Sequence, residues 1–136
     1  MSVVYLGLGS NLGNREENIK RAITLIKKLP FTSVDRVSSF YYSCGMDGAR
    51  LDFVNAVIRV YTLLHPTTLL LFLQRIEREM GRKTKGQNLP RPIDIDILLF
   101  EGIEMDSEEL TIPHPRMYKR PFVVFPLIEI KPRYGY

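Results

Sequence analysis

The order of strand-like and helix-like stretches constrains the fold of this chain more than any other feature. Two segments carry apolar residues at helical spacing, at about residues 15–29 and 66–80. Around them lie four stretches rich in β-branched and aromatic residues, at about residues 3–8, 33–42, 53–62 and 91–100. The resulting order, β-α-β-β-α-β, predicts an α+β fold of the ferredoxin-like class, in which an antiparallel sheet carries both helices on one face.

Local signals predict where the two helices begin and end. Asn14 is a candidate N-cap for the first helix, and Pro30 is expected to end it. Pro66 suits the first turn of the second helix, which we expect to end near Gly81.

The last third of the chain is predicted to elaborate this core. We expect a short strand or turn at 103–105, an extended segment at 110–115 and one or two short helices at 120–130, with Pro126 near a helix N-terminus. Residues 1–136 are expected to form one domain, with this part as a short C-terminal elaboration.

Composition argues against several classes of protein. Hydrophobic residues make up 45% of the chain and charged residues 25%, as in ordinary globular domains. The longest purely apolar run, 69–73, is too short to cross a bilayer. The start, "MSVVYLGLGSN", has no basic region and is interpreted as a strand rather than a signal peptide. Because Cys44 is the single cysteine, we expect no disulfides and a cytoplasmic setting.

A pair of aspartates interrupts the last predicted strand, "RPIDIDILLF". In a strand Asp94 and Asp96 share one face, with Cα atoms about 6.5–7 Å apart, while the isoleucines share the other. Two carboxylates there repel each other unless a cation lies between them. Mg²⁺ is the natural candidate, because it combines one or two carboxylates with water and phosphate oxygens. The alternative interpretation is an exposed strand face with two solvated aspartates.

Basic residues flank this aspartate pair in the sequence. Those before it are Arg82, Lys83, Lys85 and Arg91, and those after it are Arg116, Lys119 and Arg120. Cations around a metal-binding carboxylate pair are typical of phosphoryl transfer, in which catalysis consists of positioning and charge neutralisation. Ordinary solvated lysines and arginines would produce the same pattern.

Three glycines follow the first strand in the stretch "GLGSNLG". The spacing of Gly7, Gly9 and Gly13 matches neither the dinucleotide fingerprint nor a P-loop. A tight strand-to-helix turn is the favoured interpretation of these glycines.

Four further residues have both a functional and a structural interpretation. His114, held between two prolines in a basic segment, is a candidate phosphate ligand or a structural histidine. Asn55 lies in an apolar strand and needs hydrogen-bond partners, which could be a planar heterocycle or the backbone. Phe53 and Phe122 are expected in the core unless the fold places them opposite one another.

Five stretches occur in a characteristic order: "GSNLG", "FVNAV", "QRIEREMGR", "RPIDIDILLF" and "IPHPRMYKRPFVVFPLIEI". Together they resemble the 6-hydroxymethyl-7,8-dihydropterin pyrophosphokinase family of folate biosynthesis over nearly the whole chain. The resemblance implies a ferredoxin-like fold. It also implies transfer of the β,γ-diphosphate of ATP to the hydroxymethyl group of 6-hydroxymethyl-7,8-dihydropterin, giving AMP and the pterin diphosphate. It further implies a cytoplasmic monomer with small-molecule substrates and with neither nucleic acid nor membrane as a partner.

The resemblance implies roles for individual residues. Asp94 and Asp96 would hold two Mg²⁺ ions on the phosphates of ATP, and Arg82 and Arg91 would complete the catalytic set by clamping those phosphates. The ATP site would contain Gln74, Glu77, Lys85, Ile97, Thr111, His114 and Arg120. The pterin site would contain Ser43, Gly45, Met46, Phe53, Asn55 and Phe122. The two phenylalanines would stack on the pterin ring, and Asn55 would bind its edge.

The chain departs from the family pattern in both candidate substrate loops. The family often has a tryptophan before Gly-Pro-Arg, whereas Asn88 and Leu89 stand before Pro90 and the chain has no Trp. Thr84 replaces a frequent second arginine, and "SCG" at 43–45 replaces Thr-x-Pro.

Two other functions fit the same predicted fold. A two-metal nucleotidyl transferase would need a third carboxylate from a neighbouring strand, where only Asp52 is available. A nucleic-acid-binding module would need exposed aromatic and basic residues across the sheet face, where the aspartate pair would repel phosphate.

Overall fold

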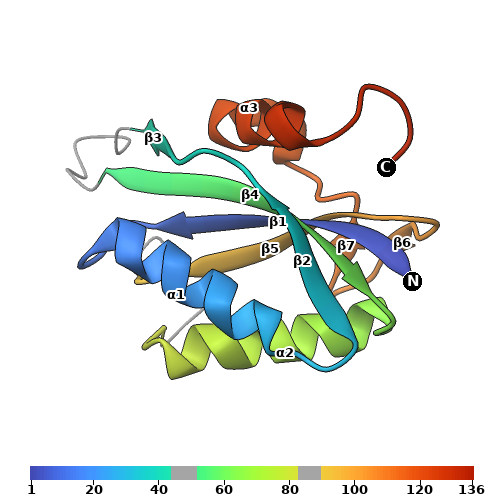
Figure 1. Ribbon diagram of the computed structural model, residues 1–136, viewed down its shortest axis with the longest axis horizontal. Helices are drawn as coiled ribbons and strands as arrows, with labels where there is room; N and C mark the ends of the chain where they lie inside the picture. Colours follow the sequence, from blue (N-terminus) through green and yellow to red (C-terminus); the bar gives the residue numbers. More distant parts are fainter. Residues whose placement is uncertain (44–51, 83–89) are drawn as a thin grey trace.

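The computed structural model describes residues 1–43, 52–82 and 90–136 (Figure 1). The first half of the chain contains β1 (Ser2–Ser10), α1 (Arg15–Lys27), β2 (Thr32–Val37), β3 (Tyr41–Ser43) and β4 (Phe53–Thr62). The second half contains α2 (Pro66–Glu79), β5 (Asp94–Phe100), β6 (Met105–Asp106), β7 (Thr111–Ile112), a 3₁₀ turn (Met117–Lys119) and α3 (Pro121–Ile130). The predicted order of strands and helices is confirmed.

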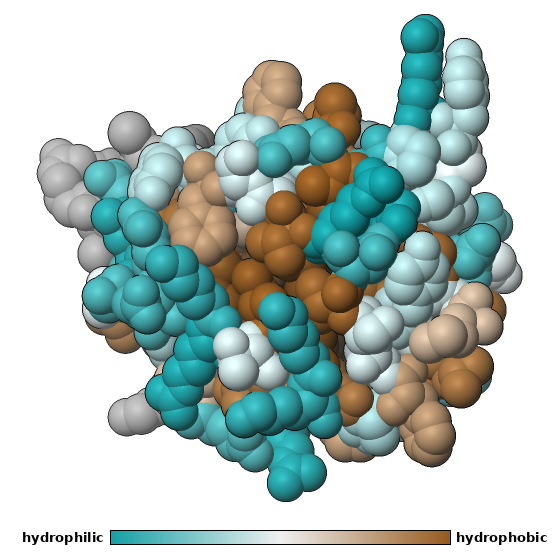
Figure 2. Space-filling view, in the orientation of Figure 1, coloured by the Kyte–Doolittle hydropathy of each residue, from teal (hydrophilic) through white to brown (hydrophobic). Residues whose placement is uncertain are grey.

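The main sheet is antiparallel, with the strand order β2-β4-β1-β5 and with β3 also paired to β4. This order is that of the predicted ferredoxin-like fold. Helices α1 and α2 cover one face of the sheet, and α3, the C-terminal elaboration, covers part of the other (Figure 1). The outward side of α1 is polar, whereas apolar atoms show between α1 and the sheet (Figure 2).

Both faces of the sheet are therefore packed. On β1, Leu6 and Leu8 face the core beneath α1 and α2, while Val3 and Tyr5 face the core beneath α3. Because side chains alternate along a strand, odd-numbered residues of β1 point to the α3 face. The same face of β4 and β5 carries Val57 and Leu98.

Both helix starts agree with the sequence signals. Asn14 caps α1, where its side chain accepts a hydrogen bond from the backbone N–H of Glu17. Pro66 is the first residue of α2, and His65 before it is the N-cap. Among the described residues no helix has the length and apolar character needed to cross a membrane.

Two predictions about element bounds are wrong. The strand expected at 33–42 is divided into β2 and β3, because the Ser38 hydroxyl takes the place of a backbone carbonyl and accepts from the N–H of Val57 at 2.9 Å. Pro126 lies inside α3 rather than near its start, because Pro121 already supplies the first-turn proline.

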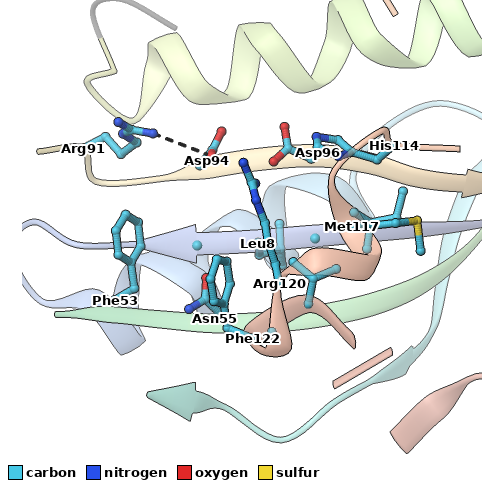
Figure 3. Close-up of a pocket in the computed structure, with 15 residues that line it drawn as sticks. Leu8, Phe53, Asn55, Arg91, Asp94, Asp96, His114, Met117, Arg120 and Phe122 are labelled. Carbon is cyan, nitrogen blue, oxygen red and sulfur yellow. Dashed lines mark ion pairs between the residues drawn. The ribbon is translucent and has the colours of Figure 1, made fainter. Parts of the chain in front are cut away.

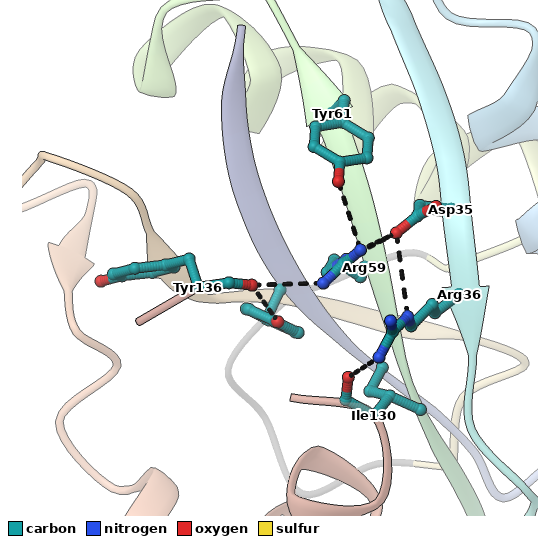
Figure 4. Close-up of polar contacts among 7 residues, drawn as sticks. Asp35, Arg36, Arg59, Tyr61, Ile130 and Tyr136 are labelled. Atoms are coloured by element: carbon teal, nitrogen blue, oxygen red, sulfur yellow. Dashed lines mark hydrogen bonds and ion pairs between the residues drawn. The ribbon is translucent and has the colours of Figure 1, made fainter. Parts of the chain in front are cut away.

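Polar contacts hold the C-terminal segment across one end of the α3 face (Figure 4). Arg59, buried on β4, is paired with Asp35 and donates to the carbonyl of Tyr136 at 3.3 Å. The Tyr5 hydroxyl donates to the same carbonyl at 2.8 Å. This end of the α3 face is closed by protein, which leaves the other end open.

Candidate active site

A cleft of about 330 Å³ opens at the free end of the α3 face (Figure 3). Three neighbouring strands, β1, β4 and β5, supply its floor and walls. The β5 residues that line it, Asp94, Asp96 and Leu98, alternate along the strand and so share one face. The predicted site residues that line it are Phe53, Asn55, Arg91, Asp94, Asp96, His114, Arg120 and Phe122. The fold thus brings together residues from β4, β5 and the segment before and within α3.

Two glycines of β1 form the floor of this cleft. A Cβ atom at Gly9 would lie 2.9 Å from Oδ1 of Asn55, and one at Gly7 would lie 3.4 Å from the side chain of Leu98. The expectation that Gly7 and Gly9 serve a tight turn is wrong, because both lie within β1. Gly13 does lie in the turn after it, with a φ of +72°.

The β4 side of the cleft carries the residues predicted to bind a heterocycle. Asn55 is buried, and its amide donates to the hydroxyl of Ser43 on β3 at 3.2 Å. Phe53 from β4 and Phe122 from α3 both line the cleft. Figure 3 shows the two rings at the same end as Asn55. Two aromatic rings and a buried amide are suited to a flat, polar-edged ligand.

The β5 side carries the charged residues. Asp94 and Asp96 face the cleft, while Ile93, Ile95 and Ile97 are buried on the other side of the strand. The predicted division of this strand into a core face and a polar face is therefore confirmed. The guanidinium of Arg120 is directed toward β5, and His114 lies beside Asp96 (Figure 3).

Backbone contacts hold His114 in this position. Its N–H donates to the carbonyl of Leu98 at 2.9 Å, which fixes the segment against β5. Its Nδ1 accepts from the N–H of Arg116 at 3.2 Å, so the proton of the neutral imidazole lies on Nε2.

A second cleft of about 260 Å³ adjoins the first. The predicted ATP-site residues Gln74, Ile97, Thr111 and His114 line it. Asp96 and His114 line both clefts, so the two meet at these residues. Glu108 and Glu109 also line the second cleft. They belong to an acidic stretch of the sequence, at 101–109, that predicted no site.

Arg82 and Glu77 lie in the interior rather than on a cleft wall. Nη1 of Arg82 is 2.6 Å from Oδ1 of Asp94 and 3.5 Å from Oε2 of Glu77. Glu77, buried on α2, also accepts from the N–H of Ile95 at 2.8 Å. The described part of the structure therefore gives Asp94 a protein cation as a partner.

Arg91 differs from Arg82, because it lines the first cleft. Its Nη1 lies 3.8 Å from Oδ2 of Asp94. Asn11 fixes its backbone: the N–H of Arg91 donates to Oδ1 of Asn11 at 2.7 Å, and the N–H of Asn11 donates to the carbonyl of Arg91 at 3.2 Å. Asn11 was missed in the sequence, where "GSNLG" was interpreted as a turn.

Asp94 and Asp96 are the candidate metal ligands of the first cleft. Among residues 1–43, 52–82 and 90–136 no group of three or more His, Cys, Asp or Glu side chains could enclose a metal ion. Two carboxylates on one strand face suit Mg²⁺, which takes its remaining ligands from water and substrate phosphates. Asp94 and Asp96 thus fit a cation shared with a phosphate ligand.

Three predicted site residues lie outside the described residues: Gly45, Met46 and Lys85. Ser43 is described, and it contacts the first cleft through Asn55.

Several known proteins have sequences similar to that of this chain. The sequence pattern of the family described as 7,8-dihydro-6-hydroxymethylpterin-pyrophosphokinase (HPPK) matches residues 5–132. The 2-amino-4-hydroxy-6-hydroxymethyldihydropteridine pyrophosphokinase of Bacillus subtilis (strain 168) is 40% identical over 131 residues, which cover 95% of this chain and 78% of the relative. The protein of the same name from Aquifex aeolicus (strain VF5) is 41% identical over 134 residues, which cover 97% and 82%.

Other similar proteins are longer. The "Bifunctional protein FolKE" of Lactococcus lactis subsp. lactis (strain IL1403) is 40% identical over 96% of this chain, which spans only 38% of that relative. A crystal structure of Plasmodium falciparum HPPK-DHPS has a TM-score of 0.74 at 15% identity, over 99% of this chain and 42% of that one, and it supports the fold. The family pattern covers nearly the whole chain, and the two relatives of similar length are about 40% identical to it; the chain belongs to the 7,8-dihydro-6-hydroxymethylpterin-pyrophosphokinase family.

Proposed function

We propose that this chain transfers the β,γ-diphosphate of ATP to the hydroxymethyl oxygen of 6-hydroxymethyl-7,8-dihydropterin, giving AMP and the pterin diphosphate. Its family is one of pyrophosphokinases. The observation that carries the assignment to this site is the junction of two clefts at Asp96 and His114. A reaction between two substrates needs such a junction, because the reacting atoms must be held about 3–3.5 Å apart.

The first cleft is proposed to bind the pterin. Phe53 and Phe122 would stack on its two faces, while Asn55 would offer a donor and an acceptor to its edge. The hydroxyl of Ser43 supports the amide of Asn55 through the hydrogen bond at 3.2 Å. Gly45 and Met46 are proposed to add contacts from residues 44–51.

The second cleft is proposed to bind the nucleoside of ATP. Ile97 offers an apolar wall, and Gln74 and Thr111 offer polar groups to the base and ribose. The triphosphate would then extend toward Asp96 and His114, where the two clefts join. Nε2 of His114, Arg91 and Arg120 would donate to its oxygens. Lys85 keeps its proposed role as an ATP ligand.

Asp94 and Asp96 are proposed to hold two Mg²⁺ ions with the phosphates. Bound there, Mg²⁺ would neutralise charge on the transferred diphosphate and on the departing AMP. Arg91 and Arg120 add fixed positive charge on the same side of the cleft. The described residues thereby act by orientation and charge, and the reaction needs no protein nucleophile. The hydroxyl proton would pass to Asp96 or to water.

Arg82 is proposed to contribute in two ways. In this structure Arg82 orients the carboxylate of Asp94 from the interior, because its Nη1 lies 2.6 Å from Oδ1 of Asp94. Its predicted role as a phosphate clamp would require it to exchange Asp94 and Glu77 for phosphate oxygens.

A cytoplasmic, monomeric state with small-molecule substrates and without nucleic acid or membrane also stays a prediction.

The test is to incubate the protein with Mg-ATP and reduced hydroxymethylpterin and to separate the nucleotides. AMP that forms only when the pterin is present supports the proposal. Formation of ADP instead, or absence of pterin-dependent AMP, contradicts it. A nucleotidyl transferase, in contrast, would release pyrophosphate from ATP.

A further inference from the structure

Glu129 on α3 gathers hydrogen bonds from the chain between β2 and β4. Its carboxylate accepts from the N–H of Ser39 at 2.9 and 3.1 Å, from the hydroxyl of Ser39 at 2.9 Å and from the hydroxyl of Tyr41 at 2.8 Å. The pKa of Glu129 is lowered, chiefly by the hydrogen bond from the Ser39 backbone, so the carboxylate is charged at neutral pH. An exposed glutamate thus has a dense set of partners that no catalytic role explains.

The position of Glu129 on the helix connects it to the cleft. Phe122 and Glu129 are seven residues apart, which places them about 10.5 Å apart along α3 and within about 20° around it. They therefore share one face of α3. Phe122 lines the first cleft, and Glu129 contacts β3 and the residues before it.

Tyr41 connects the same carboxylate to the opposite wall. In the ladder between β3 and β4, Tyr41 pairs with Asn55 and Ser43 pairs with Phe53. Alternation places Tyr41 and Ser43 on the α3 face, where Ser43 accepts from Asn55. The Tyr41–Glu129 hydrogen bond thus links the helix that carries Phe122 to the strands that carry Phe53 and Asn55.

Strand β3 makes a short backbone ladder, so side-chain contacts contribute much of what holds it. It is three residues long, and its described ladder is with β4 alone. Before β3 begins, the N–H of Ser38 still donates to the carbonyl of Val57 at 2.9 Å, but the hydroxyl of Ser38 accepts the return bond in place of a carbonyl. The side-chain contacts of Tyr41 with Glu129 and of Tyr42 with Glu16 therefore supplement this short ladder in holding β3.

We propose that Tyr41 and Glu129 are a positioning pair that sets the width of the pterin-binding end of the cleft, and so governs affinity for the pterin but not for ATP. This inference rests on the proposed function of the cleft. A planar ring between two phenyl rings requires contacts of about 3.5–4.0 Å on each face. A gap of about 0.5–1 Å already removes a quarter to a half of that attraction, so a small shift of α3 is sufficient.

The experiment compares Tyr41→Phe and Glu129→Gln with wild type. For each variant, the KM for the pterin is measured at saturating Mg-ATP and the KM for ATP at saturating pterin. Loss of this contact should raise the pterin KM about three- to tenfold and leave kcat and the ATP KM within about twofold. Circular dichroism shows whether each variant is folded.

Tyr42→Phe is the matched control. The Tyr42 hydroxyl donates to Glu16 of α1 at 2.5 Å, so the same atom is lost from the neighbouring residue on the other face of β3. This variant should keep the wild-type pterin KM. Equal increases in both KM values, an unchanged pterin KM in Tyr41→Phe, or an equal effect of Tyr42→Phe would each overturn the proposal.

A second measurement separates this inference from the proposed function. If wild type forms no pterin-dependent AMP, the proposed function fails, and the pair is judged by amide hydrogen exchange of Tyr41–Ser43. Faster exchange in Tyr41→Phe than in Tyr42→Phe supports the link from α3 to β3. Equal exchange in the two variants and wild type contradicts it.

Discussion

Gly9 shows how one missing side chain defines the cleft. It lies in the central strand β1, directly opposite Asn55 in the ladder with β4. Because Gly9 has no Cβ, the amide of Asn55 can lie over the strand rather than away from it. The amide of Asn55 and the glycine beneath it are therefore one structural unit.

Gly9→Ala should disturb this unit directly. The new Cβ would lie 2.9 Å from Oδ1 of Asn55, so the amide must move. It would then lose the place at the pterin edge that we propose for it. We expect the pterin KM to rise about tenfold, as for the loss of one well-placed hydrogen bond to a charged or strongly polar group. Steady-state kinetics with each substrate varied in turn would measure it.

Gly7→Ala is the control, because the atoms nearest to its Cβ would be those of the flexible side chain of Leu98, from 3.4 Å. A pterin KM that rises equally in both variants would show that general crowding of the floor, and not the amide of Asn55, is responsible.

At the scale of single residues, the sequence predicted which side chains share a face but not what they contact. The two-residue period placed Asp94 and Asp96 together, and the structure confirms that both line the cleft. The interior position of Arg82 could not be predicted, because its partners Glu77 and Asp94 come from a helix and a strand whose packing the sequence does not specify. The same holds for Asn11 and Arg91, which are 80 residues apart.

At the scale of elements, Glu77 joins α2 to β5. Its carboxylate accepts from the N–H of Ile95 and lies 3.5 Å from the buried guanidinium of Arg82, so it supports the strand that carries both aspartates. A glutamate on an otherwise apolar helix face is therefore part of the scaffold beneath the site.

Glu77→Ala should destabilise the fold strongly. It would leave the buried N–H of Ile95 without its acceptor, which costs about 1–3 kcal/mol, and it would remove the second carboxylate beside Arg82, which keeps Asp94 at 2.6 Å. The free energy of unfolding in urea would measure this loss.

Glu79→Ala is the matched control on the same helix. Glu79 pairs with Arg75 at 3.2 Å on the exposed side of α2, and such pairs contribute about 0–1 kcal/mol. Equal losses of stability in the two variants would contradict the role given to Glu77.

Element ends were predictable where local chemistry decides them. Asn14 and Pro66 mark helix starts through their own side chains, independent of distant contacts. The division between β2 and β3 was not predictable, because the Ser38 hydroxyl acts on Val57, 19 residues away. The residues on either side have ordinary strand character, so composition did not reveal the break.

At the scale of the whole molecule, the two ends of the α3 face have different roles. One end is closed by α3 and by the C-terminal segment that Arg59 and Tyr5 hold. The other end remains open above Gly7 and Gly9, and there the aspartates and the aromatic residues meet. The elaboration at the C-terminus thus supplies both the cover for the second core and one wall of the cleft.

Asp96 is the residue at which this arrangement can be tested as a whole, because it lines both clefts. Asp96→Asn keeps the size of the side chain and removes its charge. We expect turnover to fall at least about 10²-fold, the scale of losing one electrostatic contact in a transition state. We also expect the Mg²⁺ concentration for half-maximal rate to rise, while the circular dichroism spectrum stays unchanged.

The control is Asp106→Asn on β6, which changes an exposed carboxylate and should behave as wild type. Because Asp96 is in place only if β5, the segment of His114 and both clefts are arranged as described, an Asp96→Asn variant with normal turnover and normal Mg²⁺ dependence would contradict the site as a whole.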